Sequence, residues 1–274
     1  QSDVCMCIMT SPTYEGVISN ITAIAEILHN QNIPLMVDEA HGAHLDLSPY
    51  FTGGAISGGA DIVVHSLHKT LPSLTQTGIL HTQGDLVDRK KLEHQLAVFQ
   101  TSSPSYILMT SIDECISLLL KKKDELFRVW NNSLTLFDQK IEQSHISTLC
   151  YGKDDLNSHP NIFKFDKGKI VVSLKNTKFN NGEQFAKWLR KRHKIQLEMT
   201  LSDYALAMTS LCDSEENILS FANAIVDIPL ENNRITTLEK RTSGFANLLR
   251  NVKTEININQ AMSLEKKKVS LNEC

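Results

Sequence analysis

Four short apolar runs in the first hundred residues constrain the fold more than any other feature of the sequence. They are Val4–Met9, Pro34–Val37, Asp61–His65 and Gly78–His81. Runs of this length suit strands that are buried on both faces. A segment with helical spacing of Ile, Ala and Leu, Val17–Asn30, lies between the first two. Strand, helix, strand and strand in this order predict an α/β fold with a parallel or mixed sheet.

The pattern changes further along the chain. We expect helices at Leu86–Ala97 and Ile107–Leu126, with a break at Ser103-Pro104. Beyond residue 150 the pattern predicts a smaller α+β unit, with these elements: a hairpin of Asn161–Asp166 and Lys169–Leu174, strands at Gln196–Met199 and Ala205–Thr209, and helices at Glu183–Lys194 and Ser214–Ile225. The expected domains are therefore 1–150 and 151–230, followed by a polar segment at 231–274.

Composition excludes several classes of function. The 274 residues carry a net charge of −3, so nothing indicates a general nucleic-acid-binding surface. None of the six Cys forms a CxxC pair, and we interpret them as reduced thiols of a cytoplasmic protein. No apolar run is long enough to cross a membrane, and we see no signal peptide. The chain lacks an initiator Met and ends at Cys274, which we interpret as truncation at both ends.

Polar residues follow the predicted strands at their carboxyl ends, where open α/β sheets bind ligands. They are Asp38, His65, Ser66, His68 and Lys69. Asp38 begins the string DEAH, which occurs in helicases, but the chain has no GxxxxGK[ST] loop to hold a nucleotide phosphate. A zinc site built from Asp38, His41, His44 and Asp46 is a second hypothesis, and it leaves Lys69 unexplained. A purely structural role for all these residues is a third.

Pyridoxal phosphate chemistry is the fourth and best hypothesis. This cofactor needs a Lys to form a Schiff base and a carboxylate to keep its ring nitrogen protonated. Asp38 and Lys69 occur in the order that many such enzymes use. Ser66 and His68 flank Lys69 and could contact the phosphate.

Longer stretches of sequence support this hypothesis. Val37-Asp-Glu-Ala-His-Gly-Ala-His44, Ser66-Leu-His-Lys-Thr-Leu-Pro72, Leu74-Thr-Gln-Thr-Gly78 and Thr101-Ser-Ser-Pro-Ser-Tyr106 together resemble the Orn/Lys/Arg decarboxylase family, in its shorter, Gram-positive-type members. The resemblance covers roughly residues 4–115. Residues 151–230 match more loosely, and the segment 231–274 resembles the start of that family's C-terminal domain.

The resemblance implies a fold type I, aspartate-aminotransferase-like enzyme whose active site lies at a dimer interface. It implies that Lys69 forms the Schiff base, that Asp38 pairs with the pyridine nitrogen, and that Ser66 and His68 contact the phosphate. The remaining implied roles are these: His41 near the phenolic oxygen of the ring, Ala40 against the ring face, and Thr101–Ser103 near the partner subunit's cofactor. The family's main phosphate-binding loop and its ring-stacking His lie upstream of the matched residues.

The expected reaction is decarboxylation of lysine, ornithine or arginine to a diamine or agmatine, a step of polyamine biosynthesis. In this mechanism His68 or Lys69 returns a proton to the substrate's Cα, and Glu39 turns into the protein. An aminotransferase or β-eliminating lyase is the alternative within the same cofactor class. A non-catalytic homologue is the alternative from another class. The sequence does not select among the three basic amino acids.

Overall fold

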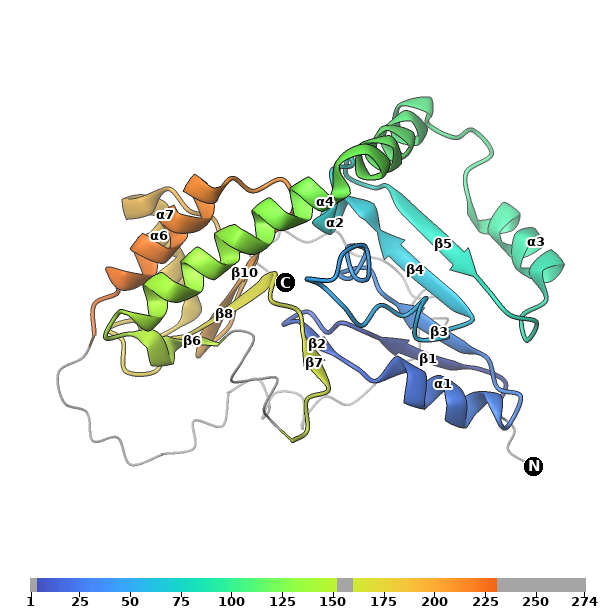
Figure 1. Ribbon diagram of the computed structural model, residues 1–274, viewed down its shortest axis with the longest axis horizontal. Coiled ribbons are helices and arrows are strands. Elements are labelled where there is room, and N and C mark those ends of the chain that lie inside the picture. Colours follow the sequence, from blue (N-terminus) through green and yellow to red (C-terminus); the bar gives the residue numbers. More distant parts are fainter. Residues whose placement is uncertain (1–3, 152–159, 231–274) are drawn as a thin grey trace, which may run out of the picture. The chain divides into compact units, whose positions relative to one another are not determined.

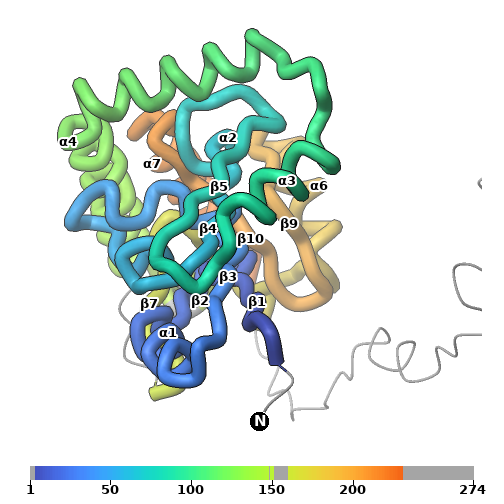
Figure 2. Tube along the Cα trace, turned by 90° about the vertical axis from the view of Figure 1, so that its right-hand side faces the viewer, coloured from blue at the N-terminus to red at the C-terminus, as the bar shows by residue number. Residues whose placement is uncertain are grey.

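A computed structural model describes residues 4–151 and 160–230 (Figure 1). Its first sheet has the strand order β1-β3-β4-β5. These strands are β1 (Cys7–Thr10), β3 (Leu35–Asp38), β4 (Ile62–Ser66) and β5 (Gly78–Thr82). The first three are parallel, and β5 is antiparallel to β4. Figure 2 shows the same order from another side. The predicted mixed α/β sheet is confirmed.

The helix α1 (Ile21–His29) packs on this sheet. Its Ile21 and Ala25 belong to one buried cluster with Leu35, Val37 and Val63 from the strands. The opposite face of β3 is partly covered, so apolar residues occupy both faces of this strand and it reads as a continuous apolar run in the sequence. The packing of α1 holds β3 and β4 in place. The candidate site lies at the carboxyl ends of these two strands.

The first helix begins later than the sequence pattern predicts. Val17 and Ile18 form a short strand, β2, that pairs with β7 (Lys164–Phe165). Asn20 starts α1 by accepting a hydrogen bond from the backbone N–H of Ala23 (3.1 Å), as a helix N-cap does. The two branched residues before that cap suit a strand, so the prediction of a helix from Val17 was wrong at its start.

The second sheet has the order β6-β8-β10-β9 and is antiparallel. Its strands are β6 (Cys150–Tyr151), β8 (Lys169–Ser173), β10 (Tyr204–Met208) and β9 (Met199–Thr200). The predicted hairpin of Asn161–Asp166 with Lys169–Leu174 was therefore wrong. Residues 164–165 pair with β2 of the N-terminal part, and β8 pairs with β6 and β10.

The described residues also contain the one-turn helix α2 (Leu67–Thr70) and four longer helices. They are α3 (Arg89–Phe99), α4 (Tyr106–Glu142), α6 (Gly182–His193) and α7 (Glu215–Val226), and a 3-10 turn, η1, spans Ser147–Leu149. The break before α4 is confirmed, since Ser105 caps that helix. The helix continues 16 residues beyond the predicted end at Leu126, because Phe127, Trp130 and Leu134 bury a second apolar stripe that packs near α7.

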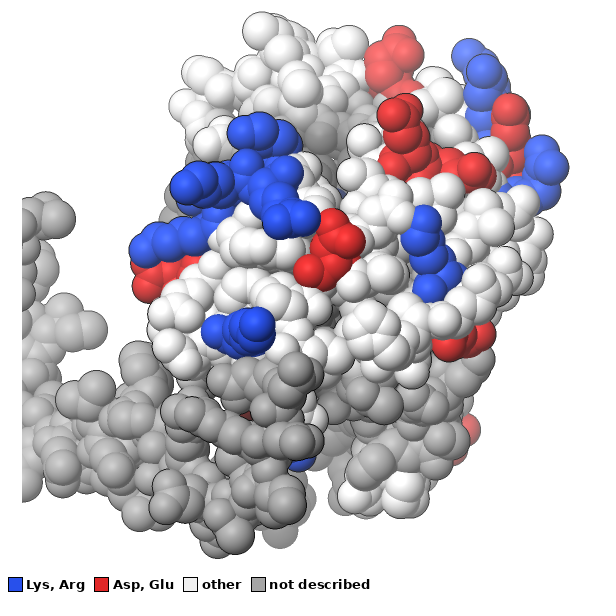
Figure 3. Space-filling model, turned by 90° about the vertical axis from the view of Figure 1, so that its left-hand side faces the viewer, with Lys and Arg blue, Asp and Glu red and all other residues white. Residues whose placement is uncertain are grey.

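Basic residues gather at the end of α6. Helix α6 ends with Arg190, Lys191, Arg192 and His193, and Lys and Arg gather in one patch on the face shown in Figure 3. Basic side chains at a helix C-terminus interact favourably with the negative end of the helix dipole. Across the described residues, no helix has the length and apolar character that crossing a membrane requires. The predicted segment at 231–274 lies outside the described residues, and the limits 1–150 and 151–230 remain predictions.

Candidate active site

The carboxyl ends of β3 and β4 bring the two predicted cofactor residues to one edge of the sheet. Asp38 is the last residue of β3 and pairs in register with Val64 of β4. Strand β4 ends at Ser66, and the one-turn helix α2 (Leu67–Thr70) follows at once with Lys69. The backbone N–H of Glu39 donates to the carbonyl of Val64 (3.0 Å), which holds the two strand ends together.

Asp38 and Glu39 turn in opposite directions. Asp38 is exposed, and its Oδ1 accepts a hydrogen bond from the backbone N–H of Ala40 (3.0 Å). Glu39 is buried, as predicted, and accepts from the backbone N–H of Ala55 and from His65 Nε2 (both 2.8 Å). Burial raises the pKa of Glu39, against the lowering effect of His65. Asp38 is therefore the carboxylate open to a ligand, and Glu39 holds the loop that contains Ala55.

Lys69 contacts His41, which a second lysine contacts from the other side. Lys69 Nζ lies 3.2 Å from His41 Nε2, and Lys169 Nζ lies 3.0 Å from His41 Nδ1. His41 is buried. Burial, then the charges of Lys169 and Lys69, lower its pKa to about 4. The imidazole is therefore neutral at neutral pH.

Lys169 comes from the first residue of β8, about a hundred residues beyond Lys69. Its side chain is 1% exposed. Burial lowers its pKa to about 8, while Asp166 and Glu198 act in the opposite direction. A buried lysine next to the proposed Schiff-base residue was not found by sequence reasoning. The signal that could have found it is a Lys opening the apolar run Lys169–Leu174, where burial is unusual for this residue type.

Tyr14 and Glu198 complete the surroundings of His41. The ring of Tyr14 lies 4.4 Å from the imidazole of His41, measured between centroids. Its hydroxyl donates to Glu198 Oε1 (2.5 Å), and this hydrogen bond to a carboxylate raises the pKa of Tyr14 to about 12. Tyr14 follows the carboxyl end of β1, where the rule used for Asp38 could have found it. Glu198 has no comparable signal.

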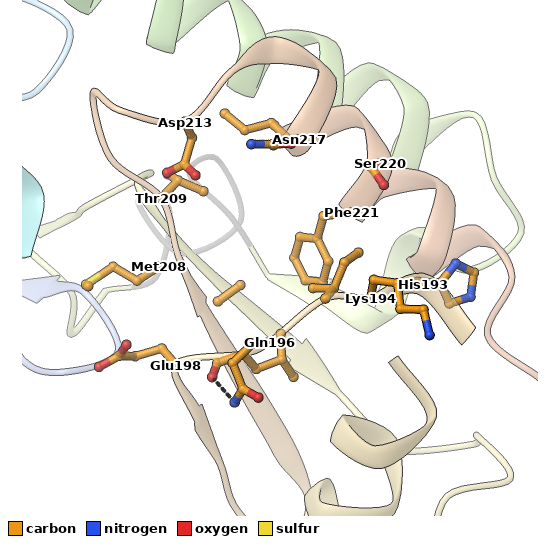
Figure 4. A pocket seen from close by; sticks show the side chains of 14 residues that line it. His193, Lys194, Gln196, Glu198, Met208, Thr209, Asp213, Asn217, Ser220 and Phe221 are labelled. Carbon is orange, nitrogen blue, oxygen red and sulfur yellow. Dashed lines mark hydrogen bonds between the residues drawn. The ribbon is translucent and has the colours of Figure 1, made fainter. Parts of the chain in front are cut away.

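A cavity of about 620 Å³ lies beside Glu198, lined by residues of α7, β10 and the segment 193–198. In Figure 4, His193 and Lys194 lie at one end of this cavity, and Asp213 and Asn217 at another side. Glu198 extends away from these residues, and its carboxylate meets Tyr14. Glu198 therefore belongs to the surroundings of His41 as well as to the wall of the cavity.

Two further predicted residues, Ser66 and His68, come shortly before Lys69 in the chain. The Nδ1–H of His68 donates to the carbonyl of Thr77 (2.9 Å). This bond fixes the ring and leaves Nε2 free to hold or release a proton. Ser66 is partly buried, and its side chain makes no capping hydrogen bond to α2. Its hydroxyl is thus available to a ligand at the strand end.

Two other predicted residues stand apart from this cluster. Thr101 is exposed in the loop between α3 and α4, and it forms local hydrogen bonds with Ser103. His44 is buried, and its Nε2 bonds Asp166 Oδ1 (3.2 Å). Within residues 4–151 and 160–230, no three His, Cys, Asp or Glu side chains converge as a metal site would require.

The chemistry of these side chains fits pyridoxal phosphate. The cofactor has an aldehyde for a primary amine, a pyridine nitrogen for a carboxylate, and a phosphate for hydroxyl and imidazole groups. Lys69 supplies the amine and Asp38 the carboxylate at the adjacent strand end. Ser66 and His68 supply the hydroxyl and the imidazole. The described residues therefore contain a matching partner for each of these three groups.

Comparison with known proteins supports the same conclusion. Residues 1–188 match the family model described as the Orn/Lys/Arg decarboxylase major domain. The chain belongs to this family. Its members are pyridoxal phosphate enzymes, and the resemblance found in the sequence is confirmed.

Several relatives are arginine decarboxylases. The protein of that name from Halalkalibacterium halodurans is 29% identical over 81% of this chain and 44% of its own length. The one from Bacillus anthracis is 31% identical over 83% of this chain and 45% of its own. The chain thus spans about half the length of these relatives.

Solved structures confirm the fold. A lysine decarboxylase from Francisella novicida superposes with a TM-score of 0.61 at 15% identity, covering 80% of this chain and 35% of that one. A ureidoglycine-glyoxylate aminotransferase from Bacillus subtilis gives 0.58 at 12% identity, covering 81% and 59%. The fold is the fold type I architecture of pyridoxal phosphate enzymes, as predicted.

Proposed function

We propose that this chain carries the cofactor-binding lysine of an enzyme that decarboxylates a basic amino acid, giving a diamine or agmatine and CO₂. The observation that carries the proposal is the placement of Asp38 at the end of β3 and of Lys69 just after the end of the adjacent parallel strand β4. The names of the relatives favour arginine within the class, and lysine and ornithine remain alternatives. We further propose that the enzyme acts in the cytoplasm, with its cysteines reduced.

Each residue of the site has a proposed task. The amine of Lys69 would hold the cofactor through its aldehyde, and the carboxylate of Asp38 would keep a proton on the pyridine nitrogen. Ser66 and His68 hold the phosphate. Ala40 packs against the ring. When bound, the cofactor supplies an electron sink for the bond that breaks.

Proton return to the substrate's Cα falls to His68 or Lys69. The Nδ1–H of His68 is committed to the carbonyl of Thr77, so only Nε2 can take up and deliver a proton. The amine of Lys69 would be the alternative base. Both residues lie in the one-turn helix α2.

We propose Glu198 as the acceptor for the cation at the far end of the substrate. Its carboxylate bonds Tyr14, and its charge raises the pKa of both His41 and Lys169, which places it within electrostatic reach of the cofactor residues. A basic substrate needs a negative group to bind the cation at its far end.

We also propose that the enzyme is a homodimer. The loop that contains Thr101 leads into α4, whose first turn exposes Tyr106 and Ile107. Exposed apolar residues in a contiguous patch mark an interface more often than chance. The hydrogen bonds of Thr101 are with Ser103 and not with the residues around Lys69, so a role at the partner's cofactor suits it better than a role at its own.

The decisive experiment is trapping with borohydride. The chain is incubated with pyridoxal phosphate, reduced, digested and mapped for the modified lysine, and the same is done with any longer protein that contains it. We expect the label on Lys69, and none in Lys69→Arg. Label on neither protein would refute the proposal.

Product analysis then separates the reactions. A decarboxylase releases CO₂ from the labelled carboxyl carbon, whereas an aminotransferase gives a keto acid. Asp38→Ala should lower turnover by about 100-fold or more, because the ring nitrogen loses its partner. Asp85→Ala, which alters an exposed carboxylate, is the matched control.

A further inference from the structure

Lys169 is a buried cation that the proposed reaction does not use. Its stem is enclosed by the backbone of Gly16, where an added Cβ would lie 2.8 Å from Lys169 Cγ. Gly16 has a φ of +107°, a conformation that favours glycine. The chain thus approaches Lys169 as closely as a glycine permits, and the amine has no route to solvent.

The only hydrogen bond that the structure gives to Lys169 Nζ, within the described residues, is to His41 Nδ1 (3.0 Å). Asp166 favours the charged amine from nearby. Its Oδ1 accepts from His44 and from the backbone of Gly168, and its buried Oδ2 makes no hydrogen bond to Lys169 or to any other described residue. A buried ammonium without a hydrogen-bond partner is costly. The bond to His41 is therefore difficult for Lys169 to give up.

His41 has a lysine on each ring nitrogen, and a neutral imidazole offers one acceptor and one donor. Two ammonium groups therefore compete for one acceptor nitrogen. Lys69 is only partly buried, so it has alternatives in solvent, and its contact is longer, 3.2 Å against 3.0 Å. Lys169 is buried and has no solvent to bond instead, so Lys169 is the lysine that donates to the acceptor nitrogen.

We propose that Lys169 is a positioning residue that holds His41 in the tautomer with its proton on Nε2, on the side of Lys69. Lys169 donates to Nδ1, so the remaining ring proton must lie on Nε2. The last step of this inference rests on the proposed function. Toward a cofactor held by Lys69, His41 would present a hydrogen-bond donor and not an acceptor.

Of the charged groups around the pair, the ammonium of Lys69 opposes this arrangement, because it faces the Nε2–H of His41 at 3.2 Å, and the burial of Lys169 outweighs it. Lys69, Glu198 and Asp38 act on His41, and its pKa of about 4 keeps the ring neutral. Asp166, Glu198 and Lys69 act on Lys169, and its pKa of about 8 keeps it mainly protonated at pH 7. The tautomer should therefore be fixed between about pH 5 and 7.

The test is a nitrogen–proton correlation spectrum of the cofactor-free chain with 15N-labelled histidine. The chain has 10 His, and the signals of His41 are those lost in His41→Gln. We expect a neutral ring at pH 6.5 with the proton on Nε2. In Lys169→Met the donor to Nδ1 is gone, so the proton should move to Nδ1 as Lys69 donates to Nε2. In Lys69→Met the Nε2 tautomer should persist.

A wild-type ring with its proton on Nδ1 would overturn the proposal. So would a tautomer that changes in Lys69→Met and not in Lys169→Met. If Lys169→Met does not fold, the wild-type and Lys69→Met spectra decide the matter on their own. Because no cofactor is present, failure here leaves the trapping experiment, and with it the proposed function, untouched.

Discussion

Among single residues, Glu198 gives the sharpest test of substrate recognition. Glu198→Gln keeps the shape of the side chain and removes its charge. A hydrogen bond to a charged group is worth about 1.5–3 kcal/mol, so we expect KM for the basic substrate to rise about 10- to 100-fold with little change in kcat. Steady-state kinetics of the complete enzyme with arginine, lysine and ornithine would measure this.

Tyr14→Phe is the matched variant. It removes the hydroxyl that bonds Glu198 and leaves the carboxylate in place, so its effect on KM should be much smaller. An unchanged KM in Glu198→Gln for all three substrates would show that the cation is bound elsewhere.

His41 gives a prediction about pH. Its pKa is about 4 in the folded chain and about 6.5 in an unfolded one, so the unfolded state binds more protons between these values. The free energy of unfolding should therefore fall as pH falls from about 6.5 to 4. His41→Gln should lose this part of the pH dependence. Denaturant unfolding at several pH values would measure it.

His94→Gln is the control, because His94 is exposed on α3. It should leave the pH dependence of unfolding unchanged. If the free energy of unfolding changes equally with pH in wild type and in His41→Gln, the burial of His41 does not contribute to the pH dependence of stability.

The residues found from sequence and those missed differ in how far their contacts reach. Asp38 ends a strand, and His68 and Lys69 follow the end of another. The rule that ligands bind at the carboxyl ends of strands therefore finds them from the sequence. Lys169 and His41 are separated by 128 positions, and Tyr14 and Glu198 by 184. Such pairs depend on how the second sheet meets the first, and one sequence carries no periodicity that reports this.

At the scale of elements, α4 has two halves with different roles. Leu134 is 3% exposed and belongs to the main core, whereas Leu120 is 80% exposed. Leu134→Ala should lower the free energy of unfolding by about 2–5 kcal/mol, since it leaves a cavity. Leu120→Ala on the same helix should change it by less than about 0.5 kcal/mol. Urea unfolding followed by circular dichroism would compare them, and similar losses in both would contradict the assigned packing.

The elements predicted correctly have strong local signals. The four strands of the first sheet are continuous apolar runs, and α7 begins at Ser214 with the expected cap. The errors occur where tertiary pairing overrides the local pattern. Residues 161–166 alternate in polarity as a hairpin strand would. Residues 164–165 nevertheless pair with Val17 and Ile18, which are far away in the sequence.

At the scale of the whole molecule, self-association is the property to test. An open apolar pocket of about 420 Å³ is lined in part by Leu74, Tyr106 and Ile107, and Ile107 is 73% exposed. A charge buried in an apolar interface is costly. Ile107→Asp should therefore weaken the dimer at least about tenfold, as measured by sedimentation velocity.

Ile27→Asp is the control for that variant, because Ile27 is equally apolar and 68% exposed on α1, away from the Thr101 loop in the sequence. It should leave the dimer intact. If the dimer brings Thr101 to the partner's cofactor, Ile107→Asp should also release pyridoxal phosphate more readily on dialysis. A monomeric Ile107→Asp that retains cofactor as well as wild type would separate dimerisation from cofactor binding and remove Thr101 from the site.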